Sequence, residues 1–148
     1  MPTVHEATTT WRGDLSGGKG SVSTKSGVLK QAPTTWKERT EGTGSEGATS
    51  PEELLAAAHA SCFAMAFSTR LAKAGVADPN ITVTAKVTFG PVPAGGNGVI
   101  ASALTVRAQA PDGDAAKLKA VAEDAKENCP ISKALKGNVA MSVEATPS

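Results

Sequence analysis

Two cysteines carry the most reactive side chains of this 148-residue chain, and they lie in different local settings. Cys62 lies in the most apolar stretch of the sequence, where a free cysteine is usually buried and inert. Cys129 comes directly before Pro130, Ile131 and Ser132, a segment that predicts a short helix with proline at its first position. Free backbone N–H groups and the helix dipole favour a thiolate at such a position. Local sequence therefore favours Cys129 as the better-activated thiol, whereas a Cys62 thiolate needs a cation supplied by tertiary structure.

Histidine offers a second kind of chemistry. His59 precedes Cys62 by one helical turn, and a cysteine–histidine pair can activate a thiol. Two positions one turn apart on a single helix are poorly placed for proton transfer, so we expect His59 to be a packed, hydrogen-bonded residue. His59 and His5 match no zinc-finger or zinc-ribbon spacing with the cysteines, and we expect no metal site.

The clearest helix of the sequence is predicted over residues 54–74. It is preceded by a capping box, in which Ser50 is the N-cap, Pro51 the first helical residue and Glu53 the third. Gly75 is typical of a helix carboxyl end. The central part is apolar on nearly every face, which indicates burial all round or close packing against another helix.

Alternating and β-prone segments predict the strands around this helix. They are expected over residues 8–11, 21–24, 36–39, 81–89, 99–110 and 138–144. A second amphipathic helix is expected after residues 111–114 and ends near Asn128. Residues 40–50 hold no large apolar side chain and predict an exposed, mobile loop. The fold class is therefore α+β, with antiparallel sheets, a long central buried helix and a second helix.

Composition excludes several classes of protein. Apolar residues make up 40% and charged residues 20%, which predicts one globular domain over residues 1–148. A net charge of +1 provides no footprint for nucleic acid or an anionic membrane. No run approaches the roughly 18 consecutive apolar residues of a membrane span, and we recognise no secretory signal. We expect a cytoplasmic location, where both thiols are reduced.

Two motifs, each containing one cysteine, resemble those of the OsmC/Ohr family of hydroperoxide reductases. They are SPEELLAAAHASCF over residues 50–63 and CPISKAL over residues 129–135. The early segments WRGD, over residues 11–14, and GKGSVSTKSGVL, over residues 18–29, look like the OsmC branch in particular. The resemblance covers essentially the whole chain, and the two cysteine motifs are specific when taken together.

The resemblance implies a thiol peroxidase. Cys62 matches the peroxidatic cysteine of the family, whose thiolate attacks the peroxide and becomes a sulfenic acid. Cys129 matches the resolving cysteine, which condenses with the sulfenic acid to form a disulfide. A dithiol of lipoyl type then reduces this disulfide. Each step agrees with general thiol chemistry, and the family needs no metal, haem or flavin.

The resemblance also implies an arginine beside the reactive sulfur and a glutamate beside that arginine. Arg39 matches the arginine of the OsmC branch, and Glu52 matches the glutamate. An arginine lowers the pKa of a nearby thiol, and a carboxylate fixes the plane of the guanidinium. Without the resemblance, Arg39 would be interpreted as a solvated strand-end charge and Glu52 as a first-turn carboxylate. Arg12 is the second choice for the arginine.

Helix geometry bears on the number of chains in the site. Glu52 and Cys62 are ten residues apart in the predicted helix, which separates them by about 15 Å along its axis. If both serve one site, the glutamate comes from a second chain whose helix runs antiparallel. The small side chains at residues 56–58, 60 and 61 permit such close packing. The intertwined homodimer of the family, with sites at the subunit boundary, agrees with this inference.

An apolar pocket would favour bulky organic hydroperoxides over hydrogen peroxide, and we expect that preference. Phe63, Met65 and Phe67 are expected in the core or in the dimer contact, and some of them in the pocket wall. A thiol–disulfide oxidoreductase is disfavoured because the chain has no Cys-x-x-Cys pair. The alternative from another class is a non-catalytic, ligand-binding or stress-protective dimer whose cysteines are buried and inert.

Overall fold

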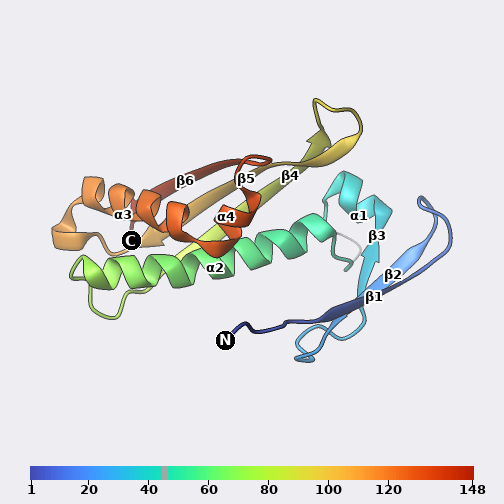
Figure 1. Cartoon of the computed structure of the whole chain (residues 1–148), viewed down its shortest axis with the longest axis horizontal. Helices are drawn as coiled ribbons and strands as arrows, with labels where there is room; N and C mark the ends of the chain where they lie inside the picture. The colour runs from blue at the N-terminus through green and yellow to red at the C-terminus, as the bar shows by residue number, and fades with distance from the viewer. Residues whose placement is uncertain (45–46) are drawn as a thin grey trace. The chain divides into compact units, whose positions relative to one another are not determined.

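The structure is a computed structural model that describes residues 1–44 and 47–148. The chain forms two compact units, residues 1–54 and 55–148, and the boundary falls within helix α2 (Pro51–Lys73). Figure 1 shows the elements of each unit along the chain. The loop predicted over residues 40–50 includes residues 45 and 46, which lie outside the described residues.

The first unit contains a three-stranded antiparallel sheet in the order β1 (Ala7–Arg12), β2 (Lys19–Thr24) and β3 (Ala32–Thr35). The strands predicted over residues 8–11 and 21–24 are therefore confirmed, whereas no strand was predicted over residues 32–35, where β3 forms. Trp11 lies opposite Gly20 in the register of the first pair of strands. A Cβ atom at Gly20 would lie 2.7 Å from the Trp11 ring, so a side chain at this position would clash with the ring.

The strand predicted over residues 36–39 is wrong, because this segment forms helix α1 (Trp36–Glu41). Thr35 is its N-cap and accepts a hydrogen bond from the N–H of Glu38, and Gly42 ends the helix in the left-handed conformation. The capping pattern of Thr35 followed three residues later by Glu38 was the sequence signal for this helix. The consequence is that Arg39 projects from the last turn of a helix.

The second unit contains the sheet β4–β5–β6, formed by β4 (Thr82–Pro91), β5 (Asn97–Ala108) and β6 (Ala140–Pro147). Strands β4 and β5 form the predicted antiparallel hairpin. The prediction of purely antiparallel sheets is wrong, because β6 pairs with β5 in parallel. A parallel pair needs a long crossover, and this one contains the short helix η1 (Pro111–Gly113), α3 (Ala115–Asn128) and α4 (Pro130–Leu135). The fold is α+β with one antiparallel and one mixed sheet.

Helix α2 contributes one face to the core of the second unit. His59, Phe63, Phe67 and Leu71 are fully buried on this face. The three apolar side chains pack with residues of β5, α3 and β6, among them Leu104, Val106, Leu118, Ala122 and Ala145. Figure 1 shows α2 running beside α3 and α4 along this sheet.

The opposite face of α2 is exposed. Ala57, Ala58, Ser61 and Met65 lie on it, and the Met65 side chain is 70% exposed. Burial all round is therefore wrong for the single chain. Of the helices in the described part of the chain, only α2 is long and apolar enough to cross a membrane, judged by length and composition. The core helix of a soluble protein passes the same test, so this is weak evidence for a span.

Candidate active site

The second unit brings the two cysteines together. Cys62 lies on α2 and is partly exposed, whereas Cys129 lies between α3 and α4 and is fully buried. The N–H of Cys129 donates to Ala125 O at 2.8 Å, and its carbonyl accepts from the N–H of Lys133 at 2.9 Å. Cys129 thus ends one helix and begins the next. Its thiol is within hydrogen-bonding reach of Cys62, and both cysteines are free thiols.

Burial and two neighbouring groups set the pKa of the Cys62 thiol. Burial raises the pKa of its thiol, and contact with the Cys129 thiol raises it further. A hydrogen bond from the backbone N–H of Ile131, in the first turn of α4, opposes these effects. This hydrogen bond contradicts the local expectation for Cys129, whose side chain makes no capping hydrogen bond to its own helix. Tertiary packing delivers the helix-terminal donor to the cysteine of another helix.

His59 is the buried histidine that the sequence predicts, and its partners come from distant segments. Its Nδ1 lies 2.7 Å from Ser102 Oγ on β5, and its Nε2 lies 2.8 Å from Ser132 Oγ on α4. Burial lowers the pKa of His59, so the ring is neutral near pH 7. Sequence reasoning did not single out Ser102 or Ser132. The signal for Ser132 was its place in the second cysteine motif, whereas Ser102 had no local signal.

The first unit brings Arg39 and Glu52 together. Arg39 Nε and Nη2 each lie 3.0 Å from Glu52 Oε1. The Glu52 side chain is 9% exposed, and its Oε2 is buried without a hydrogen-bond partner among the described residues. The guanidinium carbon of Arg39 also lies 5.8 Å from the centre of the Trp36 ring, at cation–π distance. The predicted arginine–glutamate pair therefore exists within one unit.

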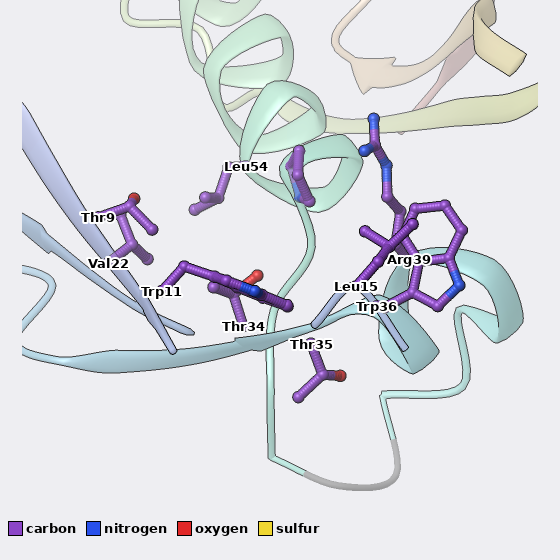
Figure 2. Close-up of a pocket in the computed structure, with 10 residues that line it drawn as sticks. Thr9, Trp11, Leu15, Val22, Thr34, Thr35, Trp36, Arg39 and Leu54 are labelled. Atoms are coloured by element: carbon purple, nitrogen blue, oxygen red, sulfur yellow. The ribbon is translucent and has the colours of Figure 1, made fainter. Parts of the chain in front are cut away.

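A cavity of about 480 Å³ lies next to this pair in the first unit. Its wall is mainly apolar and includes Trp11, Leu15, Trp36 and Leu54, with Arg39 as the charged residue. Figure 2 shows the side chains of Leu15, Trp36 and Arg39 gathered at one part of the cavity. Arg12, the second choice for the arginine, is exposed at the end of β1 and does not line the cavity. The cavity has the size and apolar character of a site for a small organic molecule.

Residues 1–44 and 47–148 contain no cluster of three or more His, Cys, Asp and Glu side chains that could hold a metal ion. The chemistry available to the described residues is that of two neighbouring thiols in one unit and a guanidinium–carboxylate pair beside an apolar cavity in the other.

Comparison with known families identifies the chain. The family described as OsmC-like protein matches residues 42–144, which include both cysteines. The chain belongs to the OsmC-like family. The resemblance stated from the sequence is therefore confirmed.

Individual relatives of this OsmC-like chain carry names from peroxide metabolism. It is 42% identical over 131 residues to the peroxiredoxin OsmC of Escherichia coli strain K12, an alignment that covers 88% of this chain and 89% of the relative. It is 33% identical over 99 residues to the organic hydroperoxide resistance protein of Xanthomonas axonopodis pv. citri, which covers 66% of each chain. The predicted class, a cysteine-based peroxide reductase, agrees with the names of these relatives.

A solved structure shows the same fold. The organic hydroperoxide resistance protein OhrB of Bacillus subtilis aligns with a TM-score of 0.72 at 27% sequence identity. The alignment covers 95% of this chain and 98% of that protein. The α+β class with one long helix is therefore shared with the OsmC/Ohr fold.

Proposed function

We propose that this OsmC-like protein reduces organic hydroperoxides, with Cys62 as the peroxidatic cysteine and Cys129 as the resolving cysteine. The observation that supports this proposal best is the contact between the two thiols across α2 and the start of α4. A thiol that becomes a sulfenic acid at Cys62 has its condensation partner already within reach. The names of the relatives support the choice of peroxide as oxidant.

The proposed cycle balances in three steps. The Cys62 thiolate attacks the distal oxygen of ROOH, the O–O bond breaks, and a proton completes the alcohol ROH while Cys62 becomes a sulfenic acid. The Cys129 sulfur then attacks the Cys62 sulfur, a disulfide forms, and the hydroxyl leaves as water with the thiol proton. A dithiol of lipoyl type reduces the disulfide, becomes a cyclic disulfide itself and returns both cysteine thiols. This cycle uses no metal, haem or flavin.

The proposal gives Arg39 and Glu52 the task of activating Cys62. Burial raises the pKa of the Cys62 thiol, so a nearby cation is needed to favour the thiolate at neutral pH. Glu52 orients Arg39 through two contacts to one oxygen, and its buried Oε2 still has an acceptor to offer. A guanidinium held in this way also presents N–H donors to a peroxide oxygen.

The active protein in this proposal is a homodimer with two equivalent sites. Glu52 and Cys62 are ten residues apart in α2, about 15 Å along the helix axis. We therefore assign the Arg39–Glu52 pair to the Cys62 of the partner subunit. The exposed face of α2, with its small side chains and Met65, supports packing against the same helix of a second chain.

The substrate class follows from the apolar cavity that Arg39 lines. Its aromatic and aliphatic wall suits the organic part of a hydroperoxide, and Arg39 suits the peroxide group. Hydrogen peroxide has no apolar part to bury, so it gains nothing from this wall. We propose that the protein works in the cytoplasm, where a dithiol can keep both cysteines reduced.

The test is peroxide consumption by three purified proteins, the wild type, Cys62→Ser and Cys129→Ser, with cumene hydroperoxide and dihydrolipoamide. The wild type is expected to turn over, and Cys62→Ser is expected to consume no peroxide. With one equivalent of peroxide and no dihydrolipoamide, Cys129→Ser is expected to consume that equivalent and to stop at the sulfenic acid, which dimedone traps. Ser61→Ala, a change beside Cys62 on the face of α2 assigned to the dimer contact, measures the effect of a local substitution, and its dimer content is measured alongside.

Reversed results for the two cysteine variants would assign the peroxidatic role to Cys129 and contradict the proposal. No consumption by the wild type would favour a non-catalytic binding protein with inert thiols. Alkylation of the thiols separates these cases further, because a buried, inert cysteine reacts slowly at neutral pH.

A further inference from the structure

A buried histidine connects three elements of the second unit. His59 on α2 contacts Ser102 on β5 through Nδ1 and Ser132 on α4 through Nε2, at 2.7 and 2.8 Å. The three residues are almost completely inaccessible, at 0, 0 and 2% exposure. Three buried polar side chains in an apolar core cost free energy unless their hydrogen bonds to one another keep good geometry. These two hydrogen bonds therefore fix the spacing of α2, β5 and α4.

The ring of His59 is neutral, so its two hydrogen bonds have opposite donor and acceptor roles. A neutral imidazole donates from one nitrogen and accepts at the other, so one serine accepts a hydrogen bond from the ring and the other donates one to it. Both ring nitrogens are used, and neither is left to exchange a proton with a substrate. His59 is thus suited to holding its neighbours in place.

The same turn of α4 meets α2 at two neighbouring positions. Cys62, one turn after His59, accepts a hydrogen bond from the Ile131 N–H. His59 is hydrogen-bonded to the hydroxyl of Ser132, the next residue of α4. Cys129 is the N-cap of this short helix. Movement of the first turn of α4 away from α2 would therefore carry the Cys129 sulfur away from Cys62.

We infer that His59 is a positioning residue that holds α4 through Ser132 and so keeps the Cys129 sulfur in reach of Cys62. This inference rests on the proposed function for its role in catalysis, and it deepens that function. In the cycle, the Ser132 contact favours disulfide formation over further oxidation of Cys62. Ser102, on β5, contacts the other nitrogen of the ring.

Two reactions compete for the sulfenic acid at Cys62. In the first, Cys129–SH and Cys62–SOH give the disulfide and one water molecule. In the second, another ROOH transfers an oxygen to Cys62–SOH, which gives the sulfinic acid and ROH. The first reaction is intramolecular and depends on the approach of the two sulfurs, whereas the second depends on peroxide concentration. A displaced α4 slows only the first.

The first experiment compares Ser132→Ala with Ser102→Ala, because each removes one buried hydroxyl and one contact to His59. The equilibrium of the Cys62–Cys129 disulfide with oxidised and reduced dithiothreitol measures how readily the two sulfurs meet, without any peroxide. The loss of one buried hydrogen bond predicts an approximately tenfold weaker disulfide in Ser132→Ala. Ser102→Ala is expected to stay close to the wild type.

Substitutions of the histidine itself give a second pair. The side-chain amide of His59→Gln reaches the position of Nε2 and retains the Ser132 contact, whereas that of His59→Asn reaches only the position of Nδ1. We expect the disulfide equilibrium of His59→Gln to stay close to that of the wild type, and that of His59→Asn to resemble that of Ser132→Ala. This pair carries the test if a serine variant fails to fold.

Mass spectrometry after excess cumene hydroperoxide gives the second readout. Ser132→Ala and His59→Asn are expected to accumulate Cys62 sulfinic acid at lower peroxide concentrations than Ser102→Ala and His59→Gln. Equal disulfide equilibria in the two serine variants, or equilibria that follow only the thermal unfolding temperatures, would overturn the inference. If wild type consumes no peroxide, the proposed function fails, while the dithiothreitol equilibrium still decides whether His59 positions Cys129.

Discussion

Arg39 binds Glu52 through two nitrogens, and both contacts end on the same carboxylate oxygen. Nε and Nη2 of Arg39 each lie 3.0 Å from Oε1, while Oε2 is buried and has no hydrogen-bond partner among residues 1–44 and 47–148. A side-on contact of this kind fixes the guanidinium plane and leaves one acceptor unused. The arrangement assigns Glu52 to orientation of Arg39, with a second oxygen to spare for another donor.

Glu52→Gln is expected to lower kcat/KM for cumene hydroperoxide. The variant keeps the shape of the side chain but replaces the ion pair with a hydrogen bond from the guanidinium to a neutral amide, which predicts a loss of about tenfold to a hundredfold. Steady-state kinetics with a dithiol reductant measure it. Glu53→Gln is the matched control, because Glu53 is the next residue of α2 and is exposed. Equal activities of the two variants would remove Glu52 from the site.

Mixed dimers test whether Glu52 serves the cysteine of the partner subunit. Co-expression of Glu52→Gln chains with Cys62→Ser chains forms heterodimers in which one site combines the intact Glu52 of one chain with the intact Cys62 of the other. Random pairing then predicts recovery of about a quarter of the wild-type activity. Each homodimer of a single variant is expected to show little or no peroxide reduction. Mixtures that recover nothing, although heterodimers form, would place Glu52 and Cys62 of one site on the same chain.

The cavity wall is expected to control substrate choice. Leu15→Ser replaces an apolar residue of the wall and should lower kcat/KM for cumene hydroperoxide about tenfold, while the rate with hydrogen peroxide changes little. Val28→Ser is the control, since Val28 is also exposed and apolar but does not line the cavity. Parallel losses with both peroxides would show that Leu15 acts on something other than the organic group.

His59 predicts a specific dependence of stability on pH. Burial lowers its pKa below the ordinary histidine value of about 6.5, so the unfolded chain gains a proton before the folded chain does as the pH falls. The stability that His59 contributes is present above pH 6.5 and is lost below it, by at most about 1.4 kcal/mol per pH unit.

Urea unfolding between pH 7.5 and pH 5 measures this dependence. As the pH is lowered, the free energy of unfolding should decrease less steeply in His59→Gln than in the wild type. His5→Gln changes the other, exposed histidine and is expected to keep the wild-type slope. An unchanged slope in His59→Gln would mean that His59 is protonated equally in the folded and unfolded chain.

Local chemistry was enough to predict the long helix and the main hairpin. The Ser50 hydroxyl accepts the hydrogen bond from the N–H of Glu53, as the capping box predicts, and Gly75 ends the segment with a positive φ. Strict alternation over residues 81–89 predicted a half-buried strand, and β4 shows that alternation in its burial. These features depend on residues close together in the chain, so the sequence alone carries them. The two cysteine motifs likewise identified the family without a structure.

Only the tertiary structure shows how segments far apart in the sequence pair and hydrogen-bond with one another. The parallel pairing of β6 with β5 depends on how the crossover packs, and the alternation of β6 is the same for either direction. The Ile131 N–H hydrogen-bonds to Cys62 and not to Cys129, because α4 packs with its first turn against α2. His59 obtains its partners from residues 43 and 73 positions away. Hydrogen-bond donors and acceptors are directional, and their directions are set only when separate elements pack together.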